Sequence, residues 1–334
     1  MKTANLIISL DFELFWGLSG WNKNQLLAYK AHIEGAIDAL TKIIEIFKKY
    51  EIKCTIGFVG GINSKSLDDF LEAAPSQHPT YKNELLSSYG LLLKLVRTGI
   101  IDNRLLFRPD IIKLLQENPL IELASHTFSH YYALEDGQNI EQFEADITTA
   151  RKESMKANIE LKTIIFPRNQ ISKPYQEICS KHGFTHIRGN EESLLYKSET
   201  TPSKYDYKRI LRLLDCYINI TGHHTYITPK AGTLIDVTAS RFLRPYNKML
   251  RFLEPLKIKR IKDDIKYAAK NGEIYHIWWH PHNFGVNTDK NIEQLELICK
   301  FYKEMQNKYG IESKFISEIL PTHDKKNKKS SFLR

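Results

Sequence analysis

The chain alternates short apolar runs of strand length with longer segments in which apolar residues recur every three or four positions. The apolar runs occupy residues 5–10, 53–59, 120–125, 162–166, 185–188 and 273–280. The helically spaced segments, typical of amphipathic helices, occupy residues 31–50, 140–157, 173–182 and 290–309. This alternation predicts parallel strands joined by crossover helices. The fold class is therefore α/β, either a barrel or a doubly wound sheet.

Neither an internal repeat nor an interdomain linker divides the sequence. We therefore expect a single barrel-like domain over residues 1–322, with insertions near residues 60–120 and 190–270. The second insertion is less regular than the rest, and we expect basic helical segments and a β-hairpin in it. Residues 323–334 form a basic tail whose composition is typical of a disordered terminus.

The composition, 42% hydrophobic and 26% charged over 334 residues, is typical of a soluble globular protein. No apolar run reaches the roughly 18–20 residues that a membrane span needs. The first apolar run stops at Asp11 without a small-residue cleavage site, so it is interpreted as a strand and not as a signal peptide. The four cysteines form no CxxC motif, which favours buried, reduced thiols. These features predict a cytoplasmic protein.

The net charge is +9, and residues 240–262 interleave eight lysines and arginines with apolar side chains. Two interpretations of this stretch stay open. It is either a helical segment whose apolar side packs on the core, or a surface that touches anionic lipid or an anionic substrate. The second interpretation would place the protein at the inner face of a membrane. No nucleic-acid-binding motif accompanies the charge, so nucleic acid is not an expected partner.

Polar and ionisable side chains follow several of the predicted strands. In barrels and doubly wound sheets, the C-terminal ends of parallel strands meet at one edge, where functional groups gather. The strand ends supply these residues: Asp11, Glu13, His126, His130, Arg168, His280 and His282. Their convergence predicts one polar site at that edge.

Three pairs of histidines are spaced four residues apart. One pair straddles a predicted helix end at Gly183, and another lies along the strand 273–280, where four residues span about 13 Å. Only His126 and His130 follow a strand end and enter a polar segment that can form a helical turn. Such a turn places side chains four residues apart within about 5–6 Å on one face, as a shared metal ion requires.

Asp11 and Glu13 are spaced so that both side chains point the same way on an extended chain. Two neighbouring carboxylates repel each other unless a cation or a proton intervenes. A metal ion held by Glu13, His126 and His130 supplies that cation and leaves coordination positions open for catalysis. Asp11 then remains free to act as a general base.

Two further residues complete the predicted chemistry. Arg168 is expected to pair with Asp11 and to hold it ionised and oriented. His280 is expected to protonate a leaving group from the opposite side, with His282 as its rival for this role. Together with a metal that polarises a carbonyl, these residues predict hydrolysis of an amide or an ester.

The segments SLDFE, SHTFSH, FPRN and WWHPH, in this order, resemble the polysaccharide deacetylases of the NodB-homology type, also called carbohydrate esterase family 4. The resemblance implies a distorted (β/α) TIM-like barrel of about seven parallel strands and a divalent metal, usually Zn²⁺. It also implies removal of N-acetyl groups from sugars.

Carried over position by position, the resemblance implies specific roles. Asp11 matches the base, Arg168 the base-orienting arginine and His280 the acid. The metal ligands would be Glu13, His126 and His130. The chain departs from the common pattern in two places. Phe12 separates the two acids, and the arginine segment reads PRNQ instead of RPPxG.

The sequence therefore predicts a metal-dependent carbohydrate N-deacetylase. Its expected substrate is an N-acetylated sugar in an intracellular precursor of a surface polysaccharide or glycolipid. Two alternatives stay open: an allantoinase-like amidohydrolase of a non-sugar C–N bond, and a non-catalytic carbohydrate-binding protein on the same scaffold. Trp16 and Trp279 flank catalytic segments, which makes either a candidate platform for a sugar ring.

Overall fold

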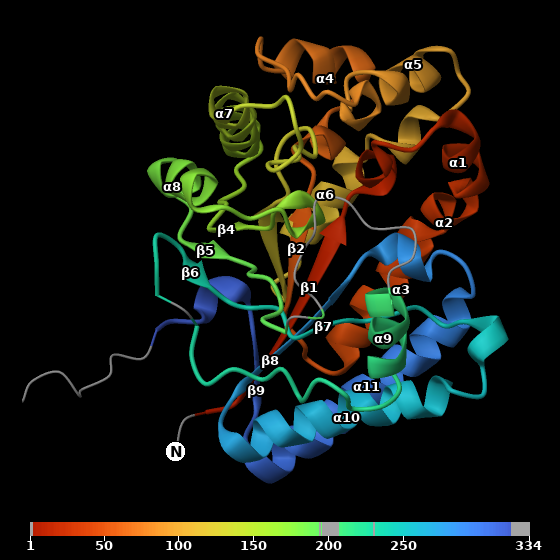
Figure 1. Cartoon of the computed structure of the whole chain (residues 1–334), viewed down its shortest axis with the longest axis vertical. Helices are drawn as coiled ribbons and strands as arrows, with labels where there is room; N and C mark the ends of the chain where they lie inside the picture. The colour runs from red at the N-terminus through yellow and green to blue at the C-terminus, as the bar shows by residue number, and fades with distance from the viewer. Residues whose placement is uncertain (1–2, 194, 196–206, 230, 322–334) are drawn as a thin grey trace, which may run out of the picture.

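A sheet of parallel strands forms the centre of the protein in the computed structural model, which describes residues 3–193, 195, 207–229 and 231–321 (Figure 1). The tail predicted for residues 323–334 lies outside this range. Across the sheet, the strands follow the order β6 (Ile235–Asp236), β5 (His186–Ile187), β4 (Thr163–Ile164), β3 (Ile121–Ser125), β2 (Cys54–Phe58), β1 (Asn5–Phe12), β8 (Ile274–Trp279) and β7 (Arg241–Phe242). A short strand, β9 (Glu312–Lys314), pairs with the start of β1.

The two outer strands of this order belong to one continuous chain segment that bridges the edges of the sheet. The amide of Val237, directly after β6, donates to the carbonyl of Ile187 in β5 at 2.9 Å. Six residues later, the amide of Leu243 donates to the carbonyl of Trp278 in β8 at 2.8 Å. The sheet therefore curls into a barrel in which β6 and β7 together occupy one strand position. The strands β1, β2, β3, β4, β5 and β8 occupy the other six positions, so the predicted barrel of about seven parallel strands is confirmed.

The helices surround this sheet (Figure 1). They are α1 (Lys23–Ala28), α2 (Lys30–Glu34), α3 (Ala36–Lys49), α4 (Leu67–Ala73), α5 (Leu91–Arg97), α6 (Pro109–Gln116), α7 (Ile140–Lys156), α8 (Lys173–Lys181), α9 (Tyr207–Asp215), α10 (Glu254–Asn271) and α11 (Thr288–Tyr309). The predicted helices at 31–50, 140–157, 173–182 and 290–309 correspond to α2 with α3, α7, α8 and α11. The helix α3 illustrates the packing, because its apolar stripe buries Ile43 and Phe47 against the core.

The central strand β1 lies between β2 and β8, and its side chains are buried in the core along nearly its whole length. This explains why its sequence is a continuous apolar run and not an alternating one. The exceptions are Ser9 and Asp11, whose polar side chains are buried and need partners there.

The expected β-hairpin in residues 190–270 is wrong for the part of this segment that the structure describes. The strands β6 and β7 run in the same direction, and each pairs in parallel with a different neighbour. The basic stretch 240–262 is likewise not one helix. It contains β7, a short 3-10 helix at Lys248–Leu250, and only then the start of α10.

The basic residues of this stretch divide into a buried and an exposed set. Arg241 and Arg260 are buried and pair with Asp264, while Lys257 is buried against Glu254. Near the short 3-10 helix, by contrast, both the basic and the apolar side chains are exposed. The first interpretation therefore holds for the buried set, and contact with anionic lipid or an anionic substrate stays a prediction for the exposed set.

All four cysteines are buried free thiols, as predicted. Among the described residues, none of the helices is both long enough and apolar enough to span a bilayer.

Candidate metal centre and active site

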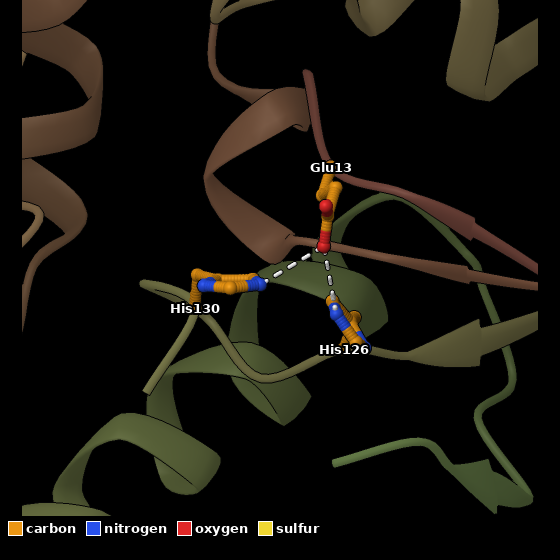
Figure 2. A group of neighbouring side chains, drawn as sticks. All are labelled: Glu13, His126 and His130. Atoms are coloured by element: carbon orange, nitrogen blue, oxygen red, sulfur yellow. Dashed lines mark hydrogen bonds and ion pairs between the residues drawn. The ribbon is translucent and has the colours of Figure 1, made fainter. Parts of the chain in front are cut away.

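Three side chains from two separate strand ends meet at the C-terminal edge of the barrel (Figure 2). Glu13 follows β1 directly, and His126 follows β3 directly. His130 lies four residues further along the same loop. One potential ligand atom from each residue lies within 4.8 Å of the other two, and all three side chains are buried. The structure therefore brings together the residues that the sequence predicted as metal ligands.

The two imidazoles present their Nε2 atoms to one carboxylate oxygen. Glu13 Oε2 lies 3.3 Å from Nε2 of His126 and 3.0 Å from Nε2 of His130. Ligands about 2.0–2.2 Å from a tetrahedral ion stand roughly 3.4 Å apart, so this spacing suits one divalent metal ion. The Nδ1 of His126 lies 2.9 Å from the carbonyl of Ile165, to which its N–H donates. That hydrogen bond leaves the Nε2 lone pair free, which is a common feature of metal-binding histidines.

The ionisation states of these groups also suit a cation. Burial lowers the pKa of His130 to about 4, so its imidazole is neutral at pH 7, as a ligand must be. Burial raises the pKa of Glu13, but the charge of His280 and the hydrogen bond from Nε2 of His130 outweigh this effect. The net pKa lies well below the ordinary value, and the carboxylate is ionised.

The loop that carries the two histidines is not the helical turn that we expected. Thr127 and His130 have φ angles of 64° and 60°, in the left-handed region that side chains other than glycine rarely adopt. A buried carboxylate of α7 holds this conformation. Asp146 accepts hydrogen bonds from the amides of Phe128 at 2.6 Å and Ser129 at 3.0 Å. The ligand spacing therefore depends on a residue outside the loop.

Gly17 makes room for the Glu13 carboxylate. A Cβ atom at this position would lie 2.0 Å from Oε1 of Glu13 and would displace the carboxylate. The glycine is in the 3-10 helix Leu14–Leu18 that follows the ligand. Any larger residue there would conflict with the present position of Glu13.

Asp11 pairs with Arg188, a residue that sequence reasoning missed. The guanidinium donates from Nη1 to Oδ1 at 2.5 Å and from Nη2 to Oδ2 at 2.7 Å, so both carboxylate oxygens are engaged. Both side chains are buried. Burial raises the pKa of Asp11, but the charge of Arg188, aided by His126 and by hydrogen bonds, outweighs it and leaves the pKa below its ordinary value. Asp11 is therefore ionised at neutral pH.

Arg188 is itself held on several sides. Its Nη2 donates to Asn169 Oδ1 at 3.0 Å, and its guanidinium lies over the Trp278 ring at 4.2 Å. It directly follows β5, so the strand-end rule could have selected it. The omission arose because only Arg168 matched the family motif.

The expected pairing of Arg168 with Asp11 is wrong. Arg168 has a φ of 52°, and its side chain turns to the rim of the site. There it donates to the carbonyl of Ser19 at 3.0 Å and pairs with Glu135 at 3.3 Å. Its guanidinium lies 4.1 Å from the ring centre of Tyr132, which in turn contacts His130 edge-on. A catalytic role for Arg168 through Asp11 therefore lacks the contact it requires.

His280 faces the carboxylates and His282 does not. Nε2 of His280 lies 3.7 Å from Asp11 Oδ2 and 3.5 Å from Glu13 Oε1, while its Nδ1 faces Asn283 Oδ1 at 3.2 Å. Its side chain is 20% exposed. His282 is buried, and burial together with the charge of His280 lowers its pKa to about 3. The geometry thus favours His280 for proton transfer.

Neither tryptophan considered as a sugar platform is available for that role. Trp16 and Trp279 are fully buried in the core. The Trp16 Nε1 donates to the carbonyl of Leu106, and its ring packs against Phe70.

Together, the barrel and its edge define a class of site. A buried Glu-His-His set suits a divalent metal, an ionised Asp11 lies beside it, and His280 stands between the two carboxylates. This is the arrangement expected of a metal-assisted hydrolase.

The comparison with protein families supports this class. The polysaccharide deacetylase family model matches residues 34–187, which contain His126, His130 and Arg168. The resemblance drawn from the motifs is confirmed over this part of the chain. Asp11, Glu13 and His280 lie outside the matched residues. No curated protein matches the sequence.

Solved structures share the fold at low sequence identity. The chain is similar to a protein from Mycobacterium smegmatis classed as a polysaccharide deacetylase, with 11% identity, a TM-score of 0.56, and 95% of this chain and 88% of that chain covered. It is also similar to the Puue allantoinase, with 12% identity, a TM-score of 0.50 and coverages of 90% and 84%. A Pseudomonas aeruginosa protein classed as a polysaccharide deacetylase gives 10% identity, a TM-score of 0.50 and coverages of 90% and 85%.

Proposed function

We propose that the protein is a metal-dependent hydrolase that removes N-acetyl groups from a carbohydrate. The observation that carries this proposal is the buried cluster of Glu13, His126 and His130 beside an ionised Asp11. The match of residues 34–187 to the polysaccharide deacetylase family supports the same chemistry. The proposed metal is Zn²⁺, because two imidazoles and one carboxylate form a donor set that zinc commonly accepts in catalytic sites.

When bound there, the metal would polarise the amide carbonyl of the substrate and lower the pKa of water in the site. Asp11 then acts as the base that removes a proton from the attacking water. The two hydrogen bonds from Arg188 keep its carboxylate ionised and fix its direction.

His280 acts as the acid for the departing amine. Its Nδ1–H can donate to Asn283, which fixes the ring and leaves Nε2 facing Asp11 and Glu13. A proton carried on Nε2 faces the two carboxylates and is placed for transfer to a leaving nitrogen in the site. The partial exposure of this side chain fits contact with a substrate at the barrel edge.

The test is acetate release by purified protein from a panel of N-acetylated sugars, nucleotide sugars and lipid-linked oligosaccharides, with zinc and with a chelator. We expect metal-dependent release from at least one compound, and none from the Glu13→Ala or His130→Ala variants, which should also lose bound metal. Met155→Ala, an exposed change on α7, is the matched control.

Two results would contradict the proposal. Turnover of cyclic ureides but of no acetylated sugar would favour a non-sugar amidohydrolase. Sugar binding without any acetate release, by protein that demonstrably holds metal, would favour a carbohydrate-binding protein.

A further inference from the structure

The turn between β7 and α10 exposes apolar side chains to solvent. Met249 is 86% exposed and Phe252 is 71% exposed, the two highest values among large apolar residues that the structure describes. Leu256, at the start of α10, is 43% exposed. Lys248 precedes Met249, Arg251 precedes Phe252, and both basic side chains are exposed. In Figure 1 this turn is the cyan segment that projects on the right. We call residues 248–256 the apolar-basic turn.

The apolar-basic turn is an ordered structure, held from inside by a buried ion pair. Lys257 Nζ lies 2.5 Å from Glu254 Oε2 and also donates to the carbonyl of Arg244 at 3.0 Å. Glu254 Oε1 accepts from the amide of Asn247 at 3.2 Å, and Asn247 Oδ1 accepts from the amide of Met249 at 2.9 Å. These contacts fix the backbone while the apolar side chains stay in water. Exposed apolar groups on a fixed frame indicate a binding surface.

The charges next to these apolar groups indicate which partner they fit. Lys248 and Arg251 make no ion pair with any residue that the structure describes, whereas Lys259 pairs with Asp263 at 2.6 Å. The two free cations stand on either side of Met249 and precede Phe252. Apolar tips flanked by unpaired cations are complementary to a bilayer with anionic headgroups, where each Lys or Arg contributes about 1 kcal/mol.

The apolar-basic turn is connected directly to the catalytic edge. It follows β7, in which the ring of Phe242 lies 5.9 Å from the ring of His280 and 4.9 Å from that of Trp278. Only a short chain segment therefore separates the proposed membrane contact from the wall of the site. This placement suits a substrate whose sugar is attached to a lipid.

We propose that the apolar-basic turn docks on anionic phospholipid, with Met249 and Phe252 entering the boundary between headgroups and acyl chains. The site would then act on a lipid-linked N-acetyl sugar. The docking is independent of catalysis, whereas the identity of the substrate rests on the deacetylase function proposed above.

Vesicle flotation tests the docking with the full chain. The vesicles are pure phosphatidylcholine or contain roughly a third phosphatidylglycerol. We expect the protein to bind only the anionic vesicles and to dissociate at high salt, since salt screens exposed charges. Lys248→Gln with Arg251→Gln should lower the partition coefficient about 25-fold, or about fivefold per cation. Met249→Ser with Phe252→Ser should lower it roughly tenfold or more.

A matched control keeps the test specific. Lys113→Gln with Leu114→Ser changes an exposed basic residue and a 53% exposed apolar residue on α6. This double variant should bind vesicles like the unaltered protein. All three double variants should keep the same melting temperature and the same acetate release from a water-soluble acetylated sugar. The two turn variants should release less acetate from a lipid-linked sugar presented in anionic vesicles.

Several outcomes would overturn the proposal. The unaltered protein could fail to bind anionic vesicles, or it could bind both kinds of vesicle equally. The control variant could also lose as much vesicle binding as the turn variants. A dimer in light scattering that the Met249→Ser and Phe252→Ser changes convert to a monomer would assign the turn to a second copy of the chain. Absence of vesicle binding by the unaltered protein, with acetate release from the soluble sugar intact, would refute only this inference. Vesicle binding without any hydrolysis would refute only the proposed function.

Discussion

Replacing Arg188 by glutamine should leave Asp11 buried without its counter-charge. The two hydrogen bonds of 2.5 and 2.7 Å between these side chains are lost, and both groups are buried. Removing one partner of a buried ion pair typically costs about 3–5 kcal/mol of stability. We therefore expect Arg188→Gln to lower the free energy of unfolding at pH 7 by about this amount, measured by urea denaturation.

The cost should depend on pH in a defined direction. In the unaltered protein the pKa of Asp11 lies below 3.8, so its pair adds stability that is present above pH 3.8 and lost as pH falls through the folded pKa. Without Arg188, the largest remaining influence is burial, which raises the pKa of Asp11. In the variant, stability should therefore fall as pH rises above 3.8. The difference between the two proteins grows from acid to neutral pH.

Activity should respond in the same direction. Because the base must be ionised, the acidic limb of the kcat/KM profile should move to higher pH in Arg188→Gln. Arg168→Gln is the matched control, since Arg168 contacts Ser19 and Glu135 but not Asp11. That variant should leave the acidic limb in place, whatever its effect on KM.

A double variant separates charge from packing. Asp11→Asn with Arg188→Gln removes both charges, so it should recover much of the lost stability while remaining inactive. The reasoning is refuted if Arg168→Gln shifts the acidic limb and Arg188→Gln does not. It is also refuted if the double variant is no more stable than Arg188→Gln alone.

Three further predictions concern the supports of the metal site. Gly17→Ala should weaken zinc binding about 10–100-fold in a competition titration, whereas Gly232→Ala, whose added Cβ would meet only one atom at 3.5 Å, should not. His280→Gln should lower kcat by about 10²–10⁴-fold without changing the metal content. His282→Ala should mainly lower the melting temperature, because the His282 ring is buried. An equal loss of kcat in the two variants would contradict the assignment of His280 as the acid. Asp146→Asn should cost about 1–3 kcal/mol at pH 7 by leaving one loop amide without an acceptor. Burial raises the pKa of Asp146 to about 6, so the contribution of this side chain to stability falls as pH rises from 3.8 through 6. The Asp146→Asn variant should lack this pH dependence when its free energy of unfolding is measured by urea titration at several pH values.

The positions of the strands and of the candidate metal ligands could be predicted because both depend on short-range signals. A buried parallel strand produces a continuous apolar run, and the residue after it must lie at the C-terminal edge. Glu13 and His126 each directly follow such a run. Their meeting at one edge follows from strand order alone, whatever the details of the intervening loops.

The choice between the two arginines could not be made this way. Arg168 and Arg188 both follow strands, and the rule that places them says nothing about side-chain direction. That direction depends on the backbone. Arg168 and Asn169 have φ angles of 52° and 54°, which turn the arginine toward the rim, whereas Arg188 continues directly from β5 into the barrel.

The basic stretch shows which ion pairs can be anticipated. Arg260 has an acid four residues later in α10, and Lys257 has one three residues earlier, and both cations are buried in those pairs. Spacing of this kind is readable in a helical sequence. Arg241 pairs with Asp264, 23 residues away, which no local pattern indicates. The partner of a cation thus follows from helix spacing in two cases and from the tertiary fold in the third.

Contacts within the protein, and not a bound ion, hold the strained backbone around the candidate metal site. Nine described non-glycine residues have positive φ, and five of them flank the site: Leu14, Thr127, His130, Arg168 and Asn169. Each such conformation costs about 1–3 kcal/mol unless surrounding contacts compensate. Here the contacts are the Asp146 carboxylate and the Ile165 carbonyl, which are protein groups and do not depend on an ion. Removal of metal should therefore lower the melting temperature only by the loss of bound-ion free energy, and should leave the far-UV circular dichroism spectrum unchanged.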